Sequence, residues 1–244
     1  MILTRVIPNY DWSNAHVEWA RGLPFYIHRL KQLGLDTRDG PFLDAGCGTG
    51  QWVDALASLG KEAVGIDVRN SRLEIASIFL HGQTHLIRAS VETLPVRDGL
   101  FKNIICYGVI MFVDAQKTLA EFNRVSCNNA HLYLCWNAIG WSLHLILSRK
   151  YNRSVKFQAL QTILNTWQER KGTKYFSMTR MVGMLERAGF EVLTKDSEGS
   201  ITVGSLDPRT VYGKGFGGFD KVLEALAVKT TVKTHRPQTR RELH

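Results

Sequence analysis

The chain has 244 residues, of which 44% are hydrophobic and 22% charged, and a net charge of +9 at pH 7. Its apolar runs fall short of the roughly 18 residues that cross a bilayer, and its first residues lack the apolar region of a signal peptide. Its four cysteines show no CxxC spacing, which favours reduced thiols in a cytoplasmic protein over a disulfide framework. We therefore expect one globular domain with no metal site.

Basic residues are concentrated in two segments. Seven basic residues and a single acid, Glu169, lie between Arg149 and Lys174, which gives a net charge of +6. From Lys229 to the last residue there are five basic residues and one acid, Glu242, a net charge of +4. The internal segment would attract a negatively charged ligand, and the terminal segment is expected to be a flexible tail.

Strand and helix patterns alternate along most of the chain, which predicts an α/β fold with a Rossmann-like, mostly parallel sheet of seven strands and helices on both faces. The expected strands are residues 41–46, 62–67, 84–89, 103–108, 131–136, 190–195 and 200–204. The expected helices between them are residues 51–60, 70–80, 115–125 and 178–189. Asn70, Asp114 and Ser177 are expected to cap the last three helices.

Two segments lie outside this alternation. Residues 11–35 are expected to form two short helices that are divided at Pro24. Residues 138–176 form an insertion after the fifth strand, with two helix patterns at 139–150 and 154–169. Four apolar residues of the second pattern recur at helical spacing, and we interpret this stripe as core packing rather than a ligand site. They are Phe157, Leu160, Leu164 and Trp167.

Three glycines follow the first expected strand. Gly46, Gly48 and Gly50 stand in the sequence FLDAGCGTG, shortly after Asp44. Ligands of open parallel sheets bind outside the carboxyl ends of the strands, where glycines let the backbone approach them closely. The spacing GxGxG differs from the GxGxxG of dinucleotide folds, because Gln51 occupies the third glycine position, and no Walker Lys-Ser/Thr pair follows. The loop therefore argues against a pyrophosphate ligand.

The motifs in this order resemble those of the class I S-adenosylmethionine-dependent methyltransferases, in their small-molecule branch. LDAGCGTG is similar to the first motif of that family, and AVGIDVR to the second. ASVETLPVRDGLFKNIICYGVIMFVD follows the usual layout of the next region, so the resemblance covers about residues 40–137 and continues more weakly through FSMTRMVGMLERAGFEVL. It implies S-adenosylmethionine as the cofactor and methyl transfer as the reaction.

The resemblance also implies which residues bind the cofactor. Asp44 would hold the amino end of the methionine moiety, and Asp67 would accept both ribose hydroxyls. The main chain of the glycine loop would contact the methionine carboxylate. Val68, Ser90 and Val91 would surround the adenine, and Tyr107 would close the methionine side. The implied cofactor-binding residues are Asp44, Gly46, Cys47, Gly48, Gly50, Asp67, Val68, Ser90, Val91 and Tyr107.

The sequence departs from the family pattern at three places. Ser90 stands where the family has an acid, so the hydrogen bond to the adenine amine is lost or comes from Glu92. Lys102 replaces an aspartate in the fourth strand. VSCNNA, residues 125–130, replaces a glycine-containing turn before the fifth strand, and its asparagines are expected to adopt left-handed conformations.

In family terms the expected organisation is one domain with a tail. The N-terminal helices would be a lid over the cofactor, with plain packing as an equal alternative, and the insertion would cover the acceptor pocket. The boundaries are 1–228 for the domain, 11–35 for the lid, 40–137 for the cofactor-binding core, 138–176 for the cap, 177–228 for the rest of the core and 229–244 for the tail.

Catalytic residues are harder to assign, because the cofactor brings its own leaving group and a base is needed only for a protonated nucleophile. His144 and Tyr107 are candidates, although a packed histidine is favoured for His144, which lies in the apolar run WSLHLIL. Trp141, His144, Arg149 and Arg153 are the candidate substrate-binding residues. The sequence does not identify one residue as the general base.

The sequence leaves three functions open. The leading one is methylation of oxygen or nitrogen on a small or mid-sized metabolite, with a negatively charged acceptor favoured by the basic insertion. RNA methylation is an alternative suggested by the basic segments, but CYGVIMF stands where base-amine methyltransferases commonly carry an Asn/Asp-Pro-Pro-Tyr/Phe signature. A catalytically silent, methyltransferase-like binding protein is the third.

Overall fold

The computed structural model describes residues 22–80, 85–203 and 215–230. At its centre is a seven-stranded sheet in the order β3-β2-β1-β4-β5-β9-β6, in which β9 is antiparallel to both of its neighbours and the other described pairs are parallel. The strands are β1 (Phe42–Ala45), β2 (Ala63–Asp67), β3 (His85–Arg88), β4 (Phe101–Tyr107), β5 (Ser126–Asn137), β6 (Phe190–Ser197) and β9 (Val222–Lys229). A separate two-stranded pair is formed by β7 (Gly215–Phe216) and β8 (Phe219–Asp220). The expected mostly parallel α/β sheet is confirmed.

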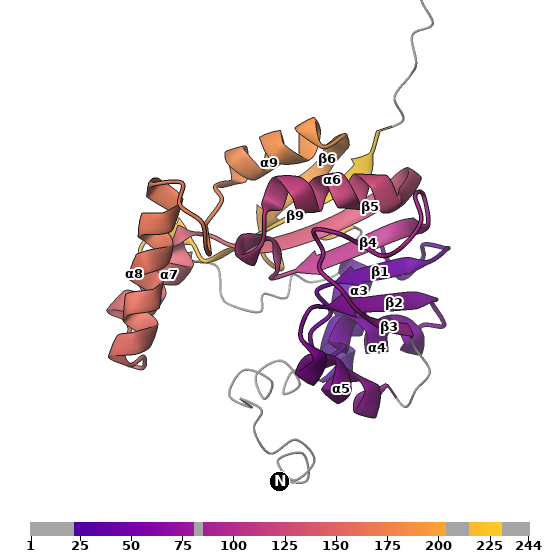
Figure 1. Ribbon diagram of the computed structural model, residues 1–244, viewed down its shortest axis with the longest axis horizontal. Helices are drawn as coiled ribbons and strands as arrows, with labels where there is room; N and C mark the ends of the chain where they lie inside the picture. The colour runs from indigo at the N-terminus through magenta and orange to yellow at the C-terminus, as the bar shows by residue number, and fades with distance from the viewer. Residues whose placement is uncertain (1–21, 81–84, 204–214, 231–244) are drawn as a thin grey trace, which may run out of the picture.

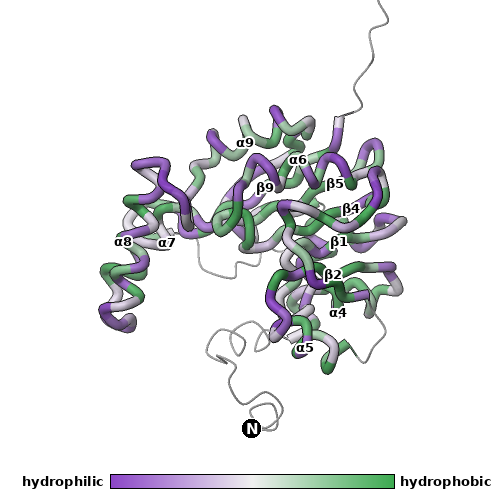
Figure 2. The backbone as a smooth tube through the Cα atoms, viewed as in Figure 1, coloured by the Kyte–Doolittle hydropathy of each residue, from purple (hydrophilic) through white to green (hydrophobic). Residues whose placement is uncertain are grey.

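Helices cover both faces of the sheet (Figure 1). One apolar layer is built with α3, α4 and α5, and the other with α6 and α9. The helices are α3 (Leu23–Gln32), α4 (Gln51–Ser58), α5 (Asn70–Phe79), α6 (Ala115–Val125), α7 (Ile139–Leu147), α8 (Arg153–Trp167), α9 (Met178–Arg187) and the single 3-10 turn η1 (Ile110–Phe112). Figure 2 shows hydrophobic residues recurring along the central strands, where the two layers meet the sheet.

Two of the three side-chain caps expected from the sequence are present. Asp114 accepts hydrogen bonds from the backbone N–H groups of the first turn of α6, and Ser177 does the same for α9. The expected cap at Asn70 is wrong, because α5 begins at Asn70 and its N-cap residue is Arg69. The backbone N–H of Arg69 donates instead to the Asp67 carboxylate at 2.8 Å, which positions the start of α5.

The seventh strand lies later in the chain than expected. Residues 200–204 were expected to close the sheet, but β9, which no pattern had indicated, fills the place between β5 and β6. Ile201 and Val203 are instead held by backbone contacts to β9 and α3: Ile201 N–H donates to the Glu224 carboxylate, and Val203 N–H donates to the Gln32 carbonyl.

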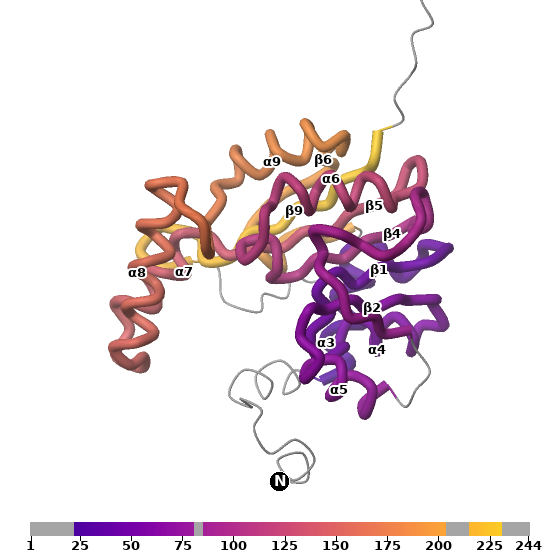
Figure 3. Tube along the Cα trace, in the orientation of Figure 1, coloured from indigo at the N-terminus to yellow at the C-terminus, as the bar shows by residue number. Residues whose placement is uncertain are grey.

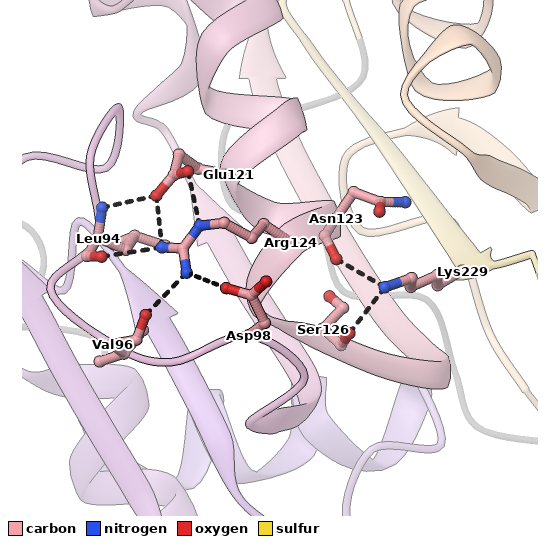
Figure 4. Close-up of polar contacts among 8 residues, drawn as sticks. All are labelled: Leu94, Val96, Asp98, Glu121, Asn123, Arg124, Ser126 and Lys229. Atoms are coloured by element: carbon pink, nitrogen blue, oxygen red, sulfur yellow. Dashed lines mark hydrogen bonds and ion pairs between the residues drawn. The ribbon is translucent and has the colours of Figure 1, made fainter.

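The end of β9 also shortens the expected tail. Lys229, placed in the tail by its charge, is the last residue of β9, and its ammonium group donates to the carbonyls of Asn123 and Ser126 at 2.8 Å (Figure 4). Residues 231–244 lie outside the described part of the chain.

The segment before the expected fifth strand belongs to that strand. β5 begins at Ser126 and pairs with β4 from Phe101 onwards, with an irregularity in register before Asn103. Asn129 has a φ of 60°, so one of the two asparagines adopts the expected left-handed conformation. The glycine-free turn is therefore accommodated as an irregular stretch inside a long strand.

Helix α3 is anchored in the core rather than placed over it. It begins at Leu23, so Pro24 lies in its first turn and does not divide two helices there, and the expected helix before it lies outside the described residues. Tyr26 is buried and packs edge-on against Trp52 of α4, with ring centroids 5.2 Å apart. The described part of this segment thus packs on the core, and the lid over residues 11–35 stays a prediction.

A buried ion pair ties α3 to the sheet. The guanidinium of Arg29 donates to the carboxylate of Glu224 in β9 and to the hydroxyl of Tyr133 in β5, and both charged side chains are almost fully buried. Arg29 also donates to Gln32, and Tyr133 donates to Glu224 at 2.8 Å. A buried charge is stable only when it is paired and hydrogen-bonded, so this cluster fixes α3 against two strands.

The insertion after β5 forms a pair of helices beside the sheet. Figure 3 shows the chain passing from β5 into α7 and α8, which stand to one side, and coming back to α9. Ser142 of α7 donates to the carbonyl of Ala159 in α8 at 2.9 Å, which joins the two helices. None of the helices in the described ranges is long and apolar enough to cross a membrane.

Candidate active site

The glycine loop between β1 and α4 has a backbone that only glycine adopts readily. Gly46, Gly48 and Gly50 have φ values of 81°, 56° and 91°, a region that other residues rarely enter. A Cβ on Gly46 would lie 2.3 Å from a methyl carbon of Val109, so this position also lacks space for a side chain. The loop is held against β2, because the N–H groups of Gly46 and Cys47 both donate to the Ile66 carbonyl.

Cys47 contributes to the loop through its backbone. Burial, together with Asp44 and Asp67, raises the pKa of its thiol, so the side chain stays neutral. A neutral, buried thiol behaves as a small apolar group. The residue is therefore suited to packing and to main-chain contact with a ligand, as the sequence predicted, and not to nucleophilic chemistry.

Asp67 ends β2 directly beside the loop. Its two carboxylate oxygens accept hydrogen bonds from Gly48 N–H at 3.0 Å and Arg69 N–H at 2.8 Å. Each carboxylate oxygen has two acceptor sites, so a ligand with two hydroxyl groups still finds acceptors here. The next residue, Val68, is 62% exposed, which leaves its side chain accessible to a flat ligand group. The structure thus brings together the two residues expected to hold a ribose and an adenine.

Asp44 is a buried carboxylate in need of a partner. It is 1% exposed, and its Oδ2 atom makes no hydrogen bond among the described residues. Burial and the nearby Asp67 raise the pKa of Asp44 well above its ordinary value. Leaving such an atom unpaired costs free energy, which a cationic or hydrogen-bond-donating ligand group would recover. Asp44 therefore fits the role of holding an ammonium group at the base of the loop.

We expect Asp44 to release a proton when a cationic ligand binds. The raised pKa means that the free protein keeps Asp44 protonated at pH values where an ordinary aspartate, with a pKa of about 3.9, is ionised. A cation stabilises the ionised form, so affinity should rise with pH up to the raised pKa of the free protein and then level off. Calorimetry with S-adenosylmethionine in buffers of different ionisation enthalpy measures the released proton.

The matched control for this experiment is Asp39→Asn, which removes a carboxylate whose side chain is 93% exposed. Asp44→Asn should abolish the proton release, and Asp39→Asn should preserve it. Equal proton release from the Asp44→Asn protein and the unaltered protein would assign the proton to another group.

The loop that carries Ser90 and Val91 is fixed to α6. Val91 is 4% exposed, and Ser90 accepts a hydrogen bond from Glu92 N–H at 3.1 Å. One oxygen of the Glu92 carboxylate accepts from Asp114 N–H at 2.8 Å. Glu92 is thus engaged at the start of α6, so the structure does not support it as the replacement for the acid that the family has at Ser90.

Arg124 of α6 holds the remainder of this loop (Figure 4). Its guanidinium donates to the carbonyls of Leu94 and Val96 and to the carboxylate of Asp98, and it forms an ion pair with Glu121 on the same helix. The hydrogen bonds from Arg124 are the main cause of the lowered pKa of Glu121. A ligand contacting Ser90 and Val91 would therefore meet a preformed surface.

Tyr107 lies at the end of β4, next to the glycine loop. Its ring packs against Trp52, the second residue of α4, with centroids 5.5 Å apart. Its hydroxyl donates to the carboxylate of Glu198 at 3.1 Å. Glu198 is 3% exposed and follows β6, 91 residues further along the chain. Sequence analysis missed Glu198, since no motif marks an isolated glutamate in a loop.

His144 is packed among aromatic side chains. It has ring contacts with Trp141, Tyr151 and Phe216, with centroids 5.5–6.1 Å apart. Burial, followed by the charges of Lys221 and Lys150, lowers the pKa of His144, so the imidazole stays neutral. This supports the packed histidine that the sequence favoured. Trp141 is partly buried against the layer that contains α3 and α4.

Arg149 and Arg153 flank the connection between α7 and α8, and both are exposed. Figures 1 and 3 show this helix pair to one side of the sheet, away from β1 and α4, which hold the glycine loop between them. Direct contact with an acceptor beside the loop, as expected from the sequence, is therefore not supported.

The sequence also led to a wrong expectation for the apolar residues of α8. Their four side chains were expected to pack in the core, but they are 39–79% exposed. The side of α8 that packs on α7 carries small residues instead, with Ala159 and Thr162 buried. Periodicity identified the amphipathic helix correctly and assigned the wrong face to the core.

Known proteins resemble the part of the chain that carries this site. A family model described as a methyltransferase domain matches residues 43–134. Malonyl-[acyl-carrier protein] O-methyltransferase of Yersinia pestis is 31% identical over 126 residues, 50% of this chain and 44% of that protein. The chain spans about half the length of the curated relatives it matches.

Solved structures share the fold. A Thermotoga maritima S-adenosylmethionine-dependent methyltransferase, described as a possible histamine N-methyltransferase, covers 89% of this chain and 95% of its own, with a TM-score of 0.54 and 19% identity. The putative methyltransferase solved in complex with a methyltransferase activator of Haloferax volcanii covers 90% of this chain and 96% of its own, with a TM-score of 0.62 and 14% identity.

Proposed function

We propose that this chain, which contains a methyltransferase domain with the class I, S-adenosylmethionine-dependent fold, transfers the methyl group of S-adenosylmethionine to an oxygen or nitrogen atom of a small acceptor. The observation that carries the proposal is the site between β1 and β2. There a loop with three glycines lies between the buried Asp44, whose Oδ2 atom has no hydrogen-bond partner among the described residues, and the Asp67 carboxylate. An ammonium group and a ribose diol together satisfy both acids.

The chain's own residues would bind and orient the two substrates. When bound, S-adenosylmethionine supplies an electrophilic methyl group on a sulfonium sulfur. Asp44 would pair with the amino group, Asp67 would accept the ribose hydroxyls, and the N-terminus of α4 would favour the carboxylate. Trp52 and Tyr107 would exclude water next to the loop, where alignment of acceptor and methyl group contributes most to the rate.

Oxygen is the acceptor atom that the comparisons favour. The curated relatives are named O-methyltransferases, although each is matched over only about half of its length. A carboxylate acceptor would need no base, whereas a hydroxyl acceptor would have to pass its proton to a base or to water. The buried Glu198 carboxylate, which accepts from Tyr107, is a group that could orient such an acceptor through the tyrosine hydroxyl.

A negatively charged acceptor is the finer part of the proposal. The segment from Arg149 to Lys174 has a net charge of +6 and follows the strand that ends beside the site. Because Arg149 and Arg153 are remote from the loop, the attraction would act over distance and be screened by salt, falling off within about 10 Å at 0.1 M. Rates with charged acceptors should therefore fall with ionic strength more than rates with neutral ones.

The test is methyl transfer from isotopically labelled S-adenosylmethionine into a cell extract, with the labelled product identified by mass spectrometry. We expect a low-molecular-mass product in the presence of the protein, and much less of it with Asp67→Ala, which lacks the ribose acceptor. The proposal would be refuted if calorimetry detects no binding of S-adenosylmethionine or of its demethylated product at millimolar concentration. If the label appears in RNA, the acceptor is RNA and not a small molecule.

A further inference from the structure

Helix α8 presents a row of large apolar side chains to solvent. Phe157, Leu160, Leu164 and Trp167 are 60%, 48%, 39% and 79% exposed, and their spacing places them on one side of the helix. We call these four residues the α8 stripe. The row extends over ten residues, about 15 Å along the helix axis. Large apolar side chains gathered on one exposed side of a helix are a candidate interaction surface.

Cations flank the stripe at both ends. Arg149, Lys150 and Arg153 are exposed before it, and Arg170 and Lys171 are exposed after it. The single acid of this segment, Glu169, forms an ion pair with Arg180 at 3.1 Å. The occupant of this surface must therefore offer apolar groups in the middle and negative charge around them.

The shape and charge of the surface favour one occupant. A second copy of the chain would bring two segments of charge +6 against each other, which is repulsive. The stripe lies on a helix pair that stands to one side of the sheet (Figures 1 and 3), so a broad surface can reach it. A fluid lipid surface does this without a matching shape, and Trp, Phe and Leu with flanking Lys and Arg are the residues of interfacial helices.

We infer that α8 binds the surface of an anionic lipid bilayer, with the α8 stripe buried at the boundary between headgroups and acyl chains and the flanking cations on the headgroup phosphates. The helix would lie in the plane of the membrane, and α7 would connect it to the methyltransferase domain. This inference goes beyond the proposed function and does not depend on it, because lipid binding requires neither cofactor nor acceptor.

The experiment is co-sedimentation with phosphatidylcholine vesicles, with and without about one third phosphatidylglycerol. We expect binding to the anionic vesicles, little binding to phosphatidylcholine alone, and loss of binding as salt approaches about 1 M. The double substitution Phe157→Gln and Trp167→Gln should lower the partition coefficient about tenfold or more, since it removes the two largest groups of the stripe.

The matched control is Ile78→Gln with Leu193→Gln, which changes two apolar residues that are 41% and 51% exposed on α5 and β6. It should leave the partition coefficient unchanged. Thermal unfolding without vesicles should be the same for both double variants, because all four side chains are exposed.

Several results would overturn the inference. One is that the unaltered protein does not bind anionic vesicles. Another is that the control variant loses as much binding as the stripe variant. A dimer in sedimentation velocity that the stripe variant abolishes would assign the surface to a second copy. The fluorescence of Trp167 alone is the difference between the emission of the unaltered protein and that of Trp167→Phe. If this emission is typical of a buried indole in the absence of vesicles, another part of the chain covers the stripe.

Discussion

Glu224→Gln should lower the free energy of unfolding by about 3–5 kcal/mol, because it leaves the Arg29 guanidinium buried without its counter-charge. The substitution keeps the size of the side chain and changes its charge, so packing is preserved. Tyr133 cannot replace the lost charge, since burial, the main cause of the raised pKa of its hydroxyl, remains in the variant and keeps the hydroxyl neutral. Urea denaturation measures the difference.

Two further variants make this result specific. Glu191→Gln alters an exposed glutamate on β6 and should change stability by less than about 0.5 kcal/mol. The double substitution Arg29→Met with Glu224→Gln removes the buried charge altogether and should recover part of the loss. A cost below about 1 kcal/mol for Glu224→Gln alone would mean that water or another group compensates Arg29.

Asp67→Ala should weaken S-adenosylmethionine binding by about 2–4 kcal/mol, roughly 30-fold to 1,000-fold, because two charge-assisted hydrogen bonds to the ribose are lost. Asp67 is also buried in the protein without ligand, where it accepts hydrogen bonds from Gly48 and Arg69. Loss of these two bonds should also lower stability by about 1–3 kcal/mol.

Glu74→Ala is the control for Asp67, since Glu74 is an exposed carboxylate on the adjacent helix α5 and bonds only at the surface to Asn70. The affinity of the Glu74→Ala protein for S-adenosylmethionine, measured by calorimetry, should equal that of the unaltered protein. Because Asp67→Ala also affects stability, affinity is measured well below its unfolding temperature. Equal affinity of Asp67→Ala and the unaltered protein would remove Asp67 from the ligand site.

Local patterns predicted the part of the site that is local in sequence. The glycines of the β1–α4 loop precede Asp67 at the end of β2 by only 17 to 21 positions, and the parallel pairing of β1 with β2 brings them together. Their left-handed backbone and tight packing explain why glycine is needed there. The same holds for Asp114 and Ser177, whose capping depends on the next three residues alone.

The rest could not be predicted because it depends on distant pairings. Arg29 and Glu224 are 195 residues apart, and each appears in its own segment as a single charge in an amphipathic or apolar run. Nothing in either segment indicates that the other neutralises it. Glu198 and Tyr107 present the same problem at a separation of 91 residues. For the α8 stripe, periodicity gave the helix and its apolar side, but not whether that side meets the core.

The position of β9 has a consequence for how the protein is made. Ribosomes synthesise β6 before β9, yet β6 and β5 are joined only through β9 in the finished sheet. A nascent chain that has just released β6 therefore carries a strand without a hydrogen-bonded neighbour and an open edge on β5, both of which invite pairing with other chains. It also holds Arg29 without its carboxylate. We expect the sheet to close only after residue 229 leaves the exit tunnel, which makes stalled or shortened translation products of this gene prone to aggregation.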